Sequence, residues 1–217
     1  MLISSPPTTE KSILKYFFPV FKNNKNLQWI GYLSSTSVYG NHNGKWVDEK
    51  SETKPTSQMG IRRLEAEQLL IANELPLVIF RLAGIYSQER NILNKIKKNS
   101  LKNIKADGQI FSRIHVEDIA QSLWLTFKNK VFNNVFNISD DYPCSYQEVT
   151  EYAAKLLDIN NLEEISFENL KDGNLKDFFQ DKKKVSNKKI KKFGLKLLYP
   201  NYKKGLNSIL KQSDKLT

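Results

Sequence analysis

The stretch Leu27-Gln-Trp-Ile-Gly-Tyr-Leu-Ser-Ser-Thr-Ser-Val-Tyr-Gly40 decides the fold. Its apolar run, residues 27–33, ends in four hydroxyl residues, and Val-Tyr-Gly follows at once. A short apolar run is typical of a buried parallel strand, and in open α/β sheets ligands bind just beyond the carboxyl ends of the strands. The stretch therefore predicts a strand that delivers hydroxyl groups to a ligand site. A serine-rich turn that only satisfies the backbone is the alternative that this stretch alone leaves open.

Working outward from this stretch, strands and helices alternate. Short apolar runs predict strands, and apolar residues at helical spacing predict helices. The strands are expected at 1–4, 76–82 and 135–138, and the helices at 8–21, 56–73, 91–98, 116–128 and 146–156. Such alternation indicates βαβ units and a mainly parallel sheet with helices on both faces. We expect one α/β domain at 1–158, which includes a polar loop at 39–55, and a small basic C-terminal lobe at 159–217 packed on it.

The composition indicates a globular protein and argues against several classes. Hydrophobic residues make up 40% of the chain, which argues against disorder. No apolar run is long enough for a transmembrane helix, and the first ten residues do not resemble a signal peptide. The single cysteine, Cys144, cannot form an intramolecular disulfide, and with two histidines a metal site is not expected. A cytoplasmic location is the default expectation.

The net charge of +11 allows two interpretations. A nucleic-acid surface is one of them, since lysines crowd residues 182–192. No aromatic residues interleave with these lysines in the way that single-stranded nucleic-acid binding requires. Solvated helix faces in a lysine-rich chain are therefore the expected explanation. We expect no nucleic-acid partner and no membrane contact, although a basic face could help attract a phosphorylated substrate.

Further motifs follow the opening stretch in a fixed order. They are Arg63-Leu-Glu-Ala-Glu67, Ala83-Gly-Ile-Tyr86, Arg113-Ile-His-Val-Glu-Asp-Ile-Ala120 and Val135-Phe-Asn-Ile-Ser-Asp140. In this order and spacing the set resembles the NAD-dependent epimerase/dehydratase group, the extended and atypical short-chain dehydrogenase/reductases, over about residues 2–206. The resemblance implies a Rossmann-like fold and NAD or NADP as cofactor. It also implies a nucleotide sugar, or a similar carbonyl or hydroxyl compound, as the small-molecule substrate.

The resemblance also implies roles for particular residues. In this group a serine or threonine polarises the substrate oxygen, and the tyrosine of a Tyr-x-x-x-Lys pair transfers the proton. Ser35 matches the polarising hydroxyl, and Tyr39 matches a tyrosine near the substrate. The remaining matches are Ser5, Pro6 and Arg63 for the cofactor, and Tyr86, Arg90, Asn91, Arg113 and His115 for the substrate. Structural roles are the alternative for each, and a lone histidine is more often structural.

Two departures from the group bear on activity. The positions of the Tyr-x-x-x-Lys pair hold Met59 and Arg63, and methionine has no proton to transfer. Tyr39 and Tyr86 are candidates to replace the missing tyrosine. No glycine-rich turn for a cofactor pyrophosphate occurs, although a dinucleotide fold needs one. By resemblance, residues 2–7 match the fourth strand of the fold, so the chain is expected to lack the first three strand–helix units.

These departures leave two hypotheses open. The first is an atypical oxidoreductase of the epimerase/dehydratase group, and the second is a non-catalytic remnant that binds a ligand or a partner chain. In either case this chain alone is expected to bind NAD or NADP weakly or not at all. The strand at 1–4 would lie at an open sheet edge, which predicts either poor solubility or self-association through that edge.

Overall fold

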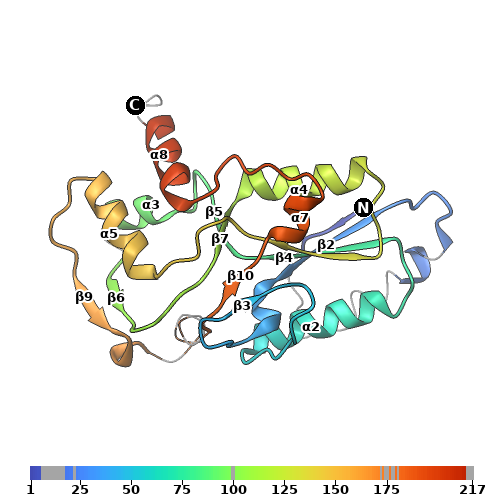
Figure 1. Cartoon of the computed structure of the whole chain (residues 1–217), viewed down its shortest axis with the longest axis horizontal. Helices are drawn as coiled ribbons and strands as arrows, with labels where there is room; N and C mark the ends of the chain where they lie inside the picture. Colours follow the sequence, from blue (N-terminus) through green and yellow to red (C-terminus); the bar gives the residue numbers. More distant parts are fainter. Residues whose placement is uncertain are drawn as a thin grey trace.

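The protein is described from a computed structural model covering residues 1–5, 18–21, 23–98, 101–171, 173, 176, 179 and 181–213. Its centre is a four-stranded sheet (Figure 1). The strand order is β1 (Leu2–Ile3), β2 (Ile30–Ser35), β4 (Leu77–Leu82) and β8 (Asn134–Ile138), and all neighbouring strands are parallel. The predicted mainly parallel α/β fold is confirmed. The helix predicted at 8–21 lies mostly outside the described residues, of which 18–21 are helical.

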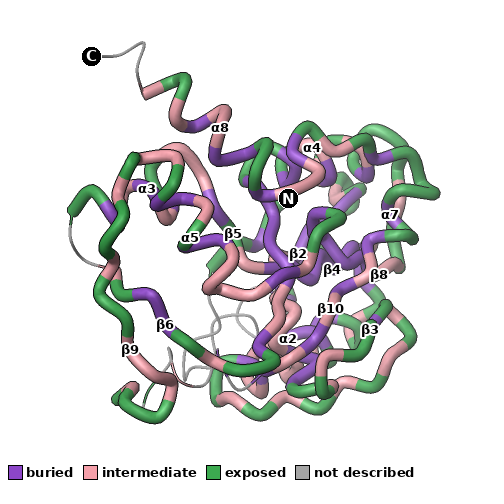
Figure 2. The backbone as a smooth tube through the Cα atoms, turned by 60° about the vertical axis from the view of Figure 1, so that its left-hand side comes forward, coloured by how far each residue is buried: buried purple, intermediate pink, exposed green. Residues whose placement is uncertain are grey.

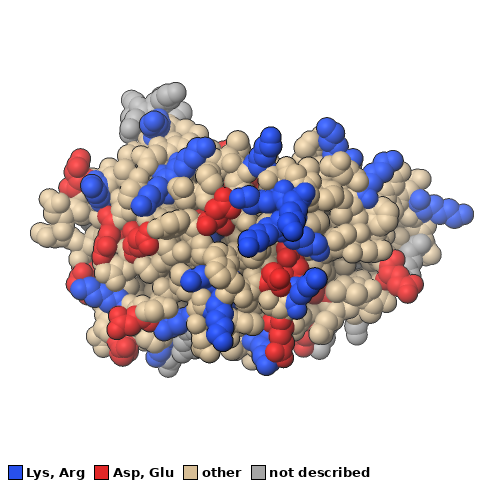
Figure 3. Space-filling model, in the orientation of Figure 1, with Lys and Arg blue, Asp and Glu red and all other residues tan. Residues whose placement is uncertain are grey.

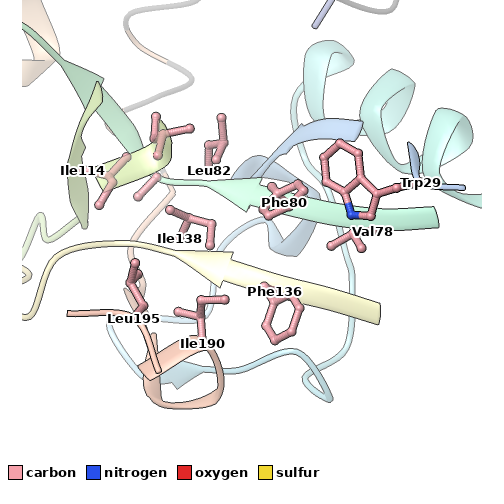
Figure 4. Close-up of a cluster of buried hydrophobic side chains, with 11 residues drawn as sticks. Trp29, Val78, Phe80, Leu82, Ile114, Phe136, Ile138, Ile190 and Leu195 are labelled. Carbon is pink, nitrogen blue, oxygen red and sulfur yellow. The ribbon is translucent and has the colours of Figure 1, made fainter. Parts of the chain in front are cut away.

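Strand β4 explains why helices cover both faces of the sheet. All six of its residues are buried, and successive side chains point to opposite faces. Leu77 and Ile79 pack in a cluster with Leu70 of α2 (Gln58–Ile71). Val78 and Phe80 pack on the other face, in a cluster with Ile119 of α4 (Val116–Lys128) and Ile190 of α7 (Lys188–Lys192). Figure 4 shows part of this cluster. Each such side chain contributes roughly 1.5–3 kcal/mol on full burial, so the sheet is stabilised from both sides.

The predicted helices begin where their capping residues place them. Ser57 accepts a hydrogen bond from the backbone N–H of Gly60 and caps α2. Ser145 caps α5 (Tyr146–Leu156) in the same way, by accepting from the backbone N–H of Glu148. Such caps satisfy backbone donors that the first turn of a helix leaves unpaired. The bounds predicted for α4 and α5 agree with the structure.

A second group of elements packs beside the sheet. Strand β5 (Gly84–Tyr86) pairs with β7 (Arg113–His115), and β6 (Asn103–Lys105) pairs with β9 (Glu164–Ser166), which leads into the short helix η2 (Phe167–Asn169). Helix α3 (Ile92–Lys97), α5 and α8 (Tyr202–Ser213) share a buried cluster in this part of the molecule (Figure 1). In Figure 2, β2 and β4 run through the buried centre, while α3, α5 and β6 of the second group lie to the left of them.

Two elements near the C-terminus contact earlier parts of the chain. Strand β10 (Lys184–Val185) pairs with β3 (Trp46–Val47), and α7 contacts β8. Lysine side chains of α7 are exposed, and Figure 3 shows Lys and Arg side chains crowded over this helix. Among the described residues, no helix is long and apolar enough to cross a membrane.

The flank at β1 is partly apolar and exposed. Strand β1 pairs with β2 on one side, and within the described part of the chain no strand pairs with its other side. Leu2 is 47% exposed there. Trp29 lies just before β2, and its ring is 5.8 Å from that of Phe127, which in turn is 5.9 Å from Trp124 on α4. We call Leu2, Trp29, Trp124 and Phe127 the apolar flank.

Candidate functional site

Ser35 lies where the sequence predicted a reactive hydroxyl. It ends β2 and caps the short helix η1 (Thr36–Tyr39) by accepting a hydrogen bond of 3.1 Å from the backbone N–H of Ser37. This bond fixes the oxygen at the carboxyl end of the strand. Because the oxygen serves as the acceptor, the hydroxyl proton can be donated to a ligand.

Ser35 lines a cavity of about 290 Å³, which we call the hydroxyl pocket. Four distant parts of the chain build it: the end of β2, the start of α2, the segment between β4 and β7, and the residues around β10. Its polar and flexible lining includes Ser35, Ser57, Met59, Ser112, Asp181 and Lys183. Met59, at the position of the missing tyrosine, therefore lies in the same pocket as Ser35, as the resemblance implied.

A second cavity of about 420 Å³ adjoins the first, and we call it the aromatic pocket. Both cavities are lined by Gly84 and Phe111, which form their common wall. Four of the five predicted substrate residues line the aromatic pocket, together with further aromatic rings. The lining includes Tyr86, Arg90, Asn91, Phe111, Arg113, Tyr146 and Tyr202.

The two arginines of the aromatic pocket differ in how much they can offer a ligand. Arg113 is buried, lies 3.7 Å above the ring of Phe111, and donates to the sulfur of Cys144 and the carbonyl of Ser145. Burial lowers the pKa of Arg113 and raises the pKa of Cys144 to about 11, so Cys144 is a protonated, unreactive thiol. Arg90 is exposed, and its guanidinium has no hydrogen-bond or ion-pair partner among the described residues.

The other predicted substrate residues have structural contacts. Asn91 caps α3 and donates to the carbonyls of Ser87 and Gln88. His115 packs its ring 5.0 Å from that of Tyr86 and 4.0 Å from that of Tyr199, and it lines neither pocket. Burial lowers the pKa of His115, so its neutral ring serves packing.

Tyr39, predicted to be catalytic, lies in a buried network rather than in either pocket. Its side chain is fully buried; the hydroxyl donates to Asn137 (2.8 Å) and accepts from Arg81 (2.9 Å). Arg81 also forms a buried ion pair with Glu67, at 2.7 Å. This geometry gives the Tyr39 hydroxyl structural partners on both sides, and its catalytic role stays a prediction. The charges of Glu67 and Arg81 inside buried elements are the only sequence sign of the network.

The predicted cofactor residues do not meet in either pocket. Arg63 donates a hydrogen bond of 2.7 Å to the carbonyl of Leu33, in β2, and lines neither pocket. Ser5 is exposed just after β1, and Pro6 lies outside the described residues. Asp118, by contrast, braces a distant loop, because its two oxygens accept from the backbone N–H groups of Leu198 and Tyr199.

Sequence reasoning missed one charged pair in the hydroxyl pocket. Lys183 donates to a carboxylate oxygen of Asp181 at 3.1 Å, and both residues are buried. The other oxygen of Asp181 accepts from the hydroxyl of Thr56 at 2.8 Å. The lysine-rich run at 182–192 hid this lysine among exposed ones.

The described residues fit a dinucleotide cofactor only in part. The hydroxyl pocket offers polar groups at the strand end, where the reactive part of a cofactor binds in such folds. A pyrophosphate needs a glycine turn at a helix N-terminus. Gly60 in the first turn of α2 does not supply one, because a Cβ there would lie 2.7 Å from the carbonyl of Ser37. Within the described parts of the chain no other glycine begins a helix, and no group of side chains could hold a metal ion.

The fold has clear counterparts among solved structures. A conserved protein of unknown function from Silicibacter pomeroyi DSS matches with a TM-score of 0.88 and 38% identity, over 98% of this chain and 77% of that one. UDP-glucuronic acid 4-epimerase from Bacillus cereus, in complex with UDP-glucuronic acid and NAD, matches with a TM-score of 0.74 and 18% identity, over 100% of this chain and 74% of that one. dTDP-glucose 4,6-dehydratase from Bacillus anthracis str. Ames, in complex with NAD, matches with a TM-score of 0.69 and 19% identity, over 86% of this chain and 61% of that one.

These matches identify first the fold of the chain and then its family. It has the Rossmann-like fold of NAD-dependent epimerases and dehydratases, and it spans 61% to 77% of the three proteins' lengths. At 38% identity it belongs to the family of the conserved Silicibacter pomeroyi protein, whose function is unknown. No protein-family model matches the sequence, and no curated protein matches it significantly.

Proposed function

We propose that the protein is an NAD(P)-dependent oxidoreductase of the epimerase/dehydratase type that acts on a nucleotide sugar or a similar carbonyl or hydroxyl compound. The observation that carries the proposal is the pair of adjoining pockets with a common wall at Gly84 and Phe111. One pocket presents the Ser35 hydroxyl, and the other presents aromatic faces and an exposed guanidinium. Together they suit a ligand with a small polyhydroxyl part and a flat, phosphorylated part.

Each part of such a ligand finds matching chemistry. The rings of Tyr86, Tyr146 and Tyr202 offer the apolar surfaces on which a nucleobase packs. Arg90 offers a planar guanidinium, which suits phosphate oxygens in particular. In the hydroxyl pocket, Ser35 would donate to an oxygen of the sugar. Solved neighbours of the same fold contain UDP-glucuronic acid or UDP-glucose, which supports this assignment.

The cofactor would contribute hydride exchange at the sugar carbon when bound. NAD is present in several neighbours, and this supports its choice here. The described residues supply no pyrophosphate cradle, so those contacts would come from outside them. The contribution of this chain is to bind the substrate and to orient its oxygen at Ser35.

A second candidate function rests on Met59. This side chain lines the hydroxyl pocket at the position where the acid/base tyrosine is expected, and a thioether carries no exchangeable proton. A non-catalytic protein that binds the same ligand, or a partner chain, is therefore the alternative. The two functions differ in turnover, because only the enzyme would convert a nucleotide sugar to a product in the presence of the cofactor, which chromatography of the incubated sugar detects. In an active protein, Ser35→Ala should lower turnover more than Met59→Ala does.

Calorimetry tests the shared part of both functions. We expect UDP-glucuronic acid to bind the full chain, and Arg90→Ala to weaken binding about tenfold through loss of a charge-assisted hydrogen bond to phosphate. Lys97→Ala is the matched control, because Lys97 is an exposed cation at the end of α3 that lies outside the pocket lining. Absence of binding by UDP, UDP-glucuronic acid and dTDP-glucose at millimolar concentration would overturn the proposal.

A further inference from the structure

Lys183 differs from the other lysines in the described part of the chain because it both lines a cavity and is buried. It directly precedes β10, is 6% exposed, and lines the hydroxyl pocket together with Ser35 and Met59. Lysine is rarely buried to this extent without a partner. Its partner is Asp181, and these two are the only titratable side chains among the described residues that line the pocket.

The backbone around Lys183 is held on both sides. The carbonyl of Lys182 accepts from the backbone N–H groups of His42 and Gly44, at 3.1 and 2.8 Å. The N–H of Lys183 donates to the carbonyl of Ile110, and the N–H of Lys184 donates to the carbonyl of Lys45. The side chain is thus presented to the pocket from a fixed segment, which suits a group that must meet a ligand at a defined position.

Asp181 orients the ammonium group and leaves part of it free. One of its oxygens accepts from Thr56 and the other from Lys183. An ammonium group has three N–H donors, and the contact with Asp181 uses one of them. The other two have no partner among the described residues, and Lys183 lines the pocket, so they are available to a ligand oxygen there. Ser35, on the same lining, can donate to that oxygen as well.

We propose that Lys183 exchanges a proton with the reacting oxygen of the substrate, in the place of the missing tyrosine. In one direction an Nζ–H bond breaks as an O–H bond forms on the substrate, which leaves a neutral amine. In the other direction the neutral amine takes the proton back from the substrate hydroxyl. The inference rests on the proposed function for the identity of the ligand, and on the pocket geometry for the role of Lys183.

The electrostatics of the pocket suit this role. Burial lowers the pKa of Lys183 below its usual value, and the charge of Asp181 opposes the shift without cancelling it. A lysine with a lowered pKa holds more neutral amine near neutral pH than an exposed lysine does. Proton exchange is most efficient when the pKa of the exchanging group lies near the working pH.

Competitive labelling of the full chain with acetic anhydride between pH 6 and pH 10, read by mass spectrometry, tests the inference without any ligand. We expect Lys183 to become reactive at lower pH than Lys184, the control one residue along the chain. Asp181→Asn should move the midpoint of Lys183 to still lower pH, because it removes the charge that stabilises the ammonium form. A Lys183 that stays unlabelled, or that titrates together with Lys184, overturns the inference.

Turnover supplies the second readout. Lys183→Met keeps an unbranched side chain without the charge, and we expect it to lower kcat about a hundredfold or more with little change in KM. Unchanged kcat would overturn the role of Lys183 and leave the proposed function standing. If Lys183 is labelled with a midpoint at lower pH than Lys184 but the chain binds no nucleotide sugar, the result would instead count against the proposed function alone. The labelling result holds even if Lys183→Met fails to fold.

Discussion

Replacing Glu67 with glutamine should destabilise the protein by about 3–5 kcal/mol, the usual effect of breaking a buried ion pair from one side. Glu67 is 1% exposed, and three N–H···O contacts of 2.7–3.2 Å join it to the guanidinium of Arg81. Ser34 donates to the same carboxylate at 2.5 Å. Glutamine would turn an N–H donor toward Arg81 in place of one oxygen and would leave the buried positive charge without a counterion.

Urea denaturation followed by circular dichroism measures this loss. Glu89→Gln is the matched control, because Glu89 is exposed, and it should stay within about 0.5 kcal/mol of the wild type. The double variant Glu67→Met with Arg81→Met should recover much of the lost free energy of unfolding, since apolar replacement of both partners is often neutral. A loss below about 1 kcal/mol for Glu67→Gln would refute the reasoning.

The same buried network predicts how replacement of Tyr39 affects stability. Its hydroxyl both donates to Asn137 and accepts from Arg81, so Tyr39→Phe leaves two buried groups without a partner. We expect a loss of about 1–3 kcal/mol in unfolding free energy. If the role of Tyr39 is structural, the affinity for UDP-glucuronic acid should not change. Reduced affinity or turnover with unchanged stability would favour a catalytic role.

Two further predictions concern acid stability and the surface. Burial raises the pKa of Asp140 to about 7, and one of its oxygens has no partner among the described residues. The folded chain keeps a proton on Asp140 up to about pH 7, whereas the unfolded chain loses it above about pH 4. The free energy of unfolding therefore falls as pH rises from about 4 to about 7 and stays at the lower level above that. Asp140→Asn should remove this fall, so its free energy of unfolding relative to the wild type should be up to about 4 kcal/mol higher at pH 8 than at pH 4. Urea denaturation measures it, and parallel pH profiles of the variant and the wild type would contradict the prediction. On the apolar flank, Trp124 is 62% exposed, so Trp124→Glu should reduce self-association, as measured by light scattering. Trp46, which is 57% exposed on β3, is the control, and Trp46→Glu should leave self-association unchanged. Equal effects of the two substitutions would place the contact elsewhere.

The elements that the sequence predicted are those with strong local periodicity. Helices α4 and α5 carry apolar residues at helical spacing, and their bounds agree with the prediction. Strand β4 was predicted because both faces of a central strand are covered, which makes its sequence a continuous apolar run. Ser35 was placed at the end of β2 because a strand that stops in hydroxyl residues leaves them at the edge of the sheet.

The contacts that the sequence could not predict join distant segments. Arg81 and Glu67 come from β4 and α2, and nothing in either segment shows that the two charges meet. Tyr39 matched a motif, and the motif cannot tell whether a hydroxyl faces a cavity or a buried arginine. The pairing of β10 with β3 joins two strands of two residues each, which are too short to give a periodic pattern.

Lys183 shows how composition can hide a site. Residues 181, 183 and 185 are buried, and 182 and 184 are only partly buried, which is the alternation of an extended segment. In an apolar strand this alternation would be visible as a pattern of apolar and polar residues. Here the inward positions are filled by Asp181, Lys183 and Val185, so the pattern is lost in a run of charges.

The polar loop at 39–55 gains a specific role from the same contacts. It was predicted to be a loop because it is polar and rich in turn-forming residues, and its length alone could not tell what it does. Its backbone groups at His42, Gly44 and Lys45 hold the segment that carries Lys183, and β3 within it pairs with β10. The acid/base group that we infer thus enters the pocket from the C-terminal segment. Helix α2, to which the sequence resemblance assigns the tyrosine, supplies only Met59 at that position. The chemistry that we propose for the pocket therefore depends on the pairing of β3 with β10 as much as on the central sheet.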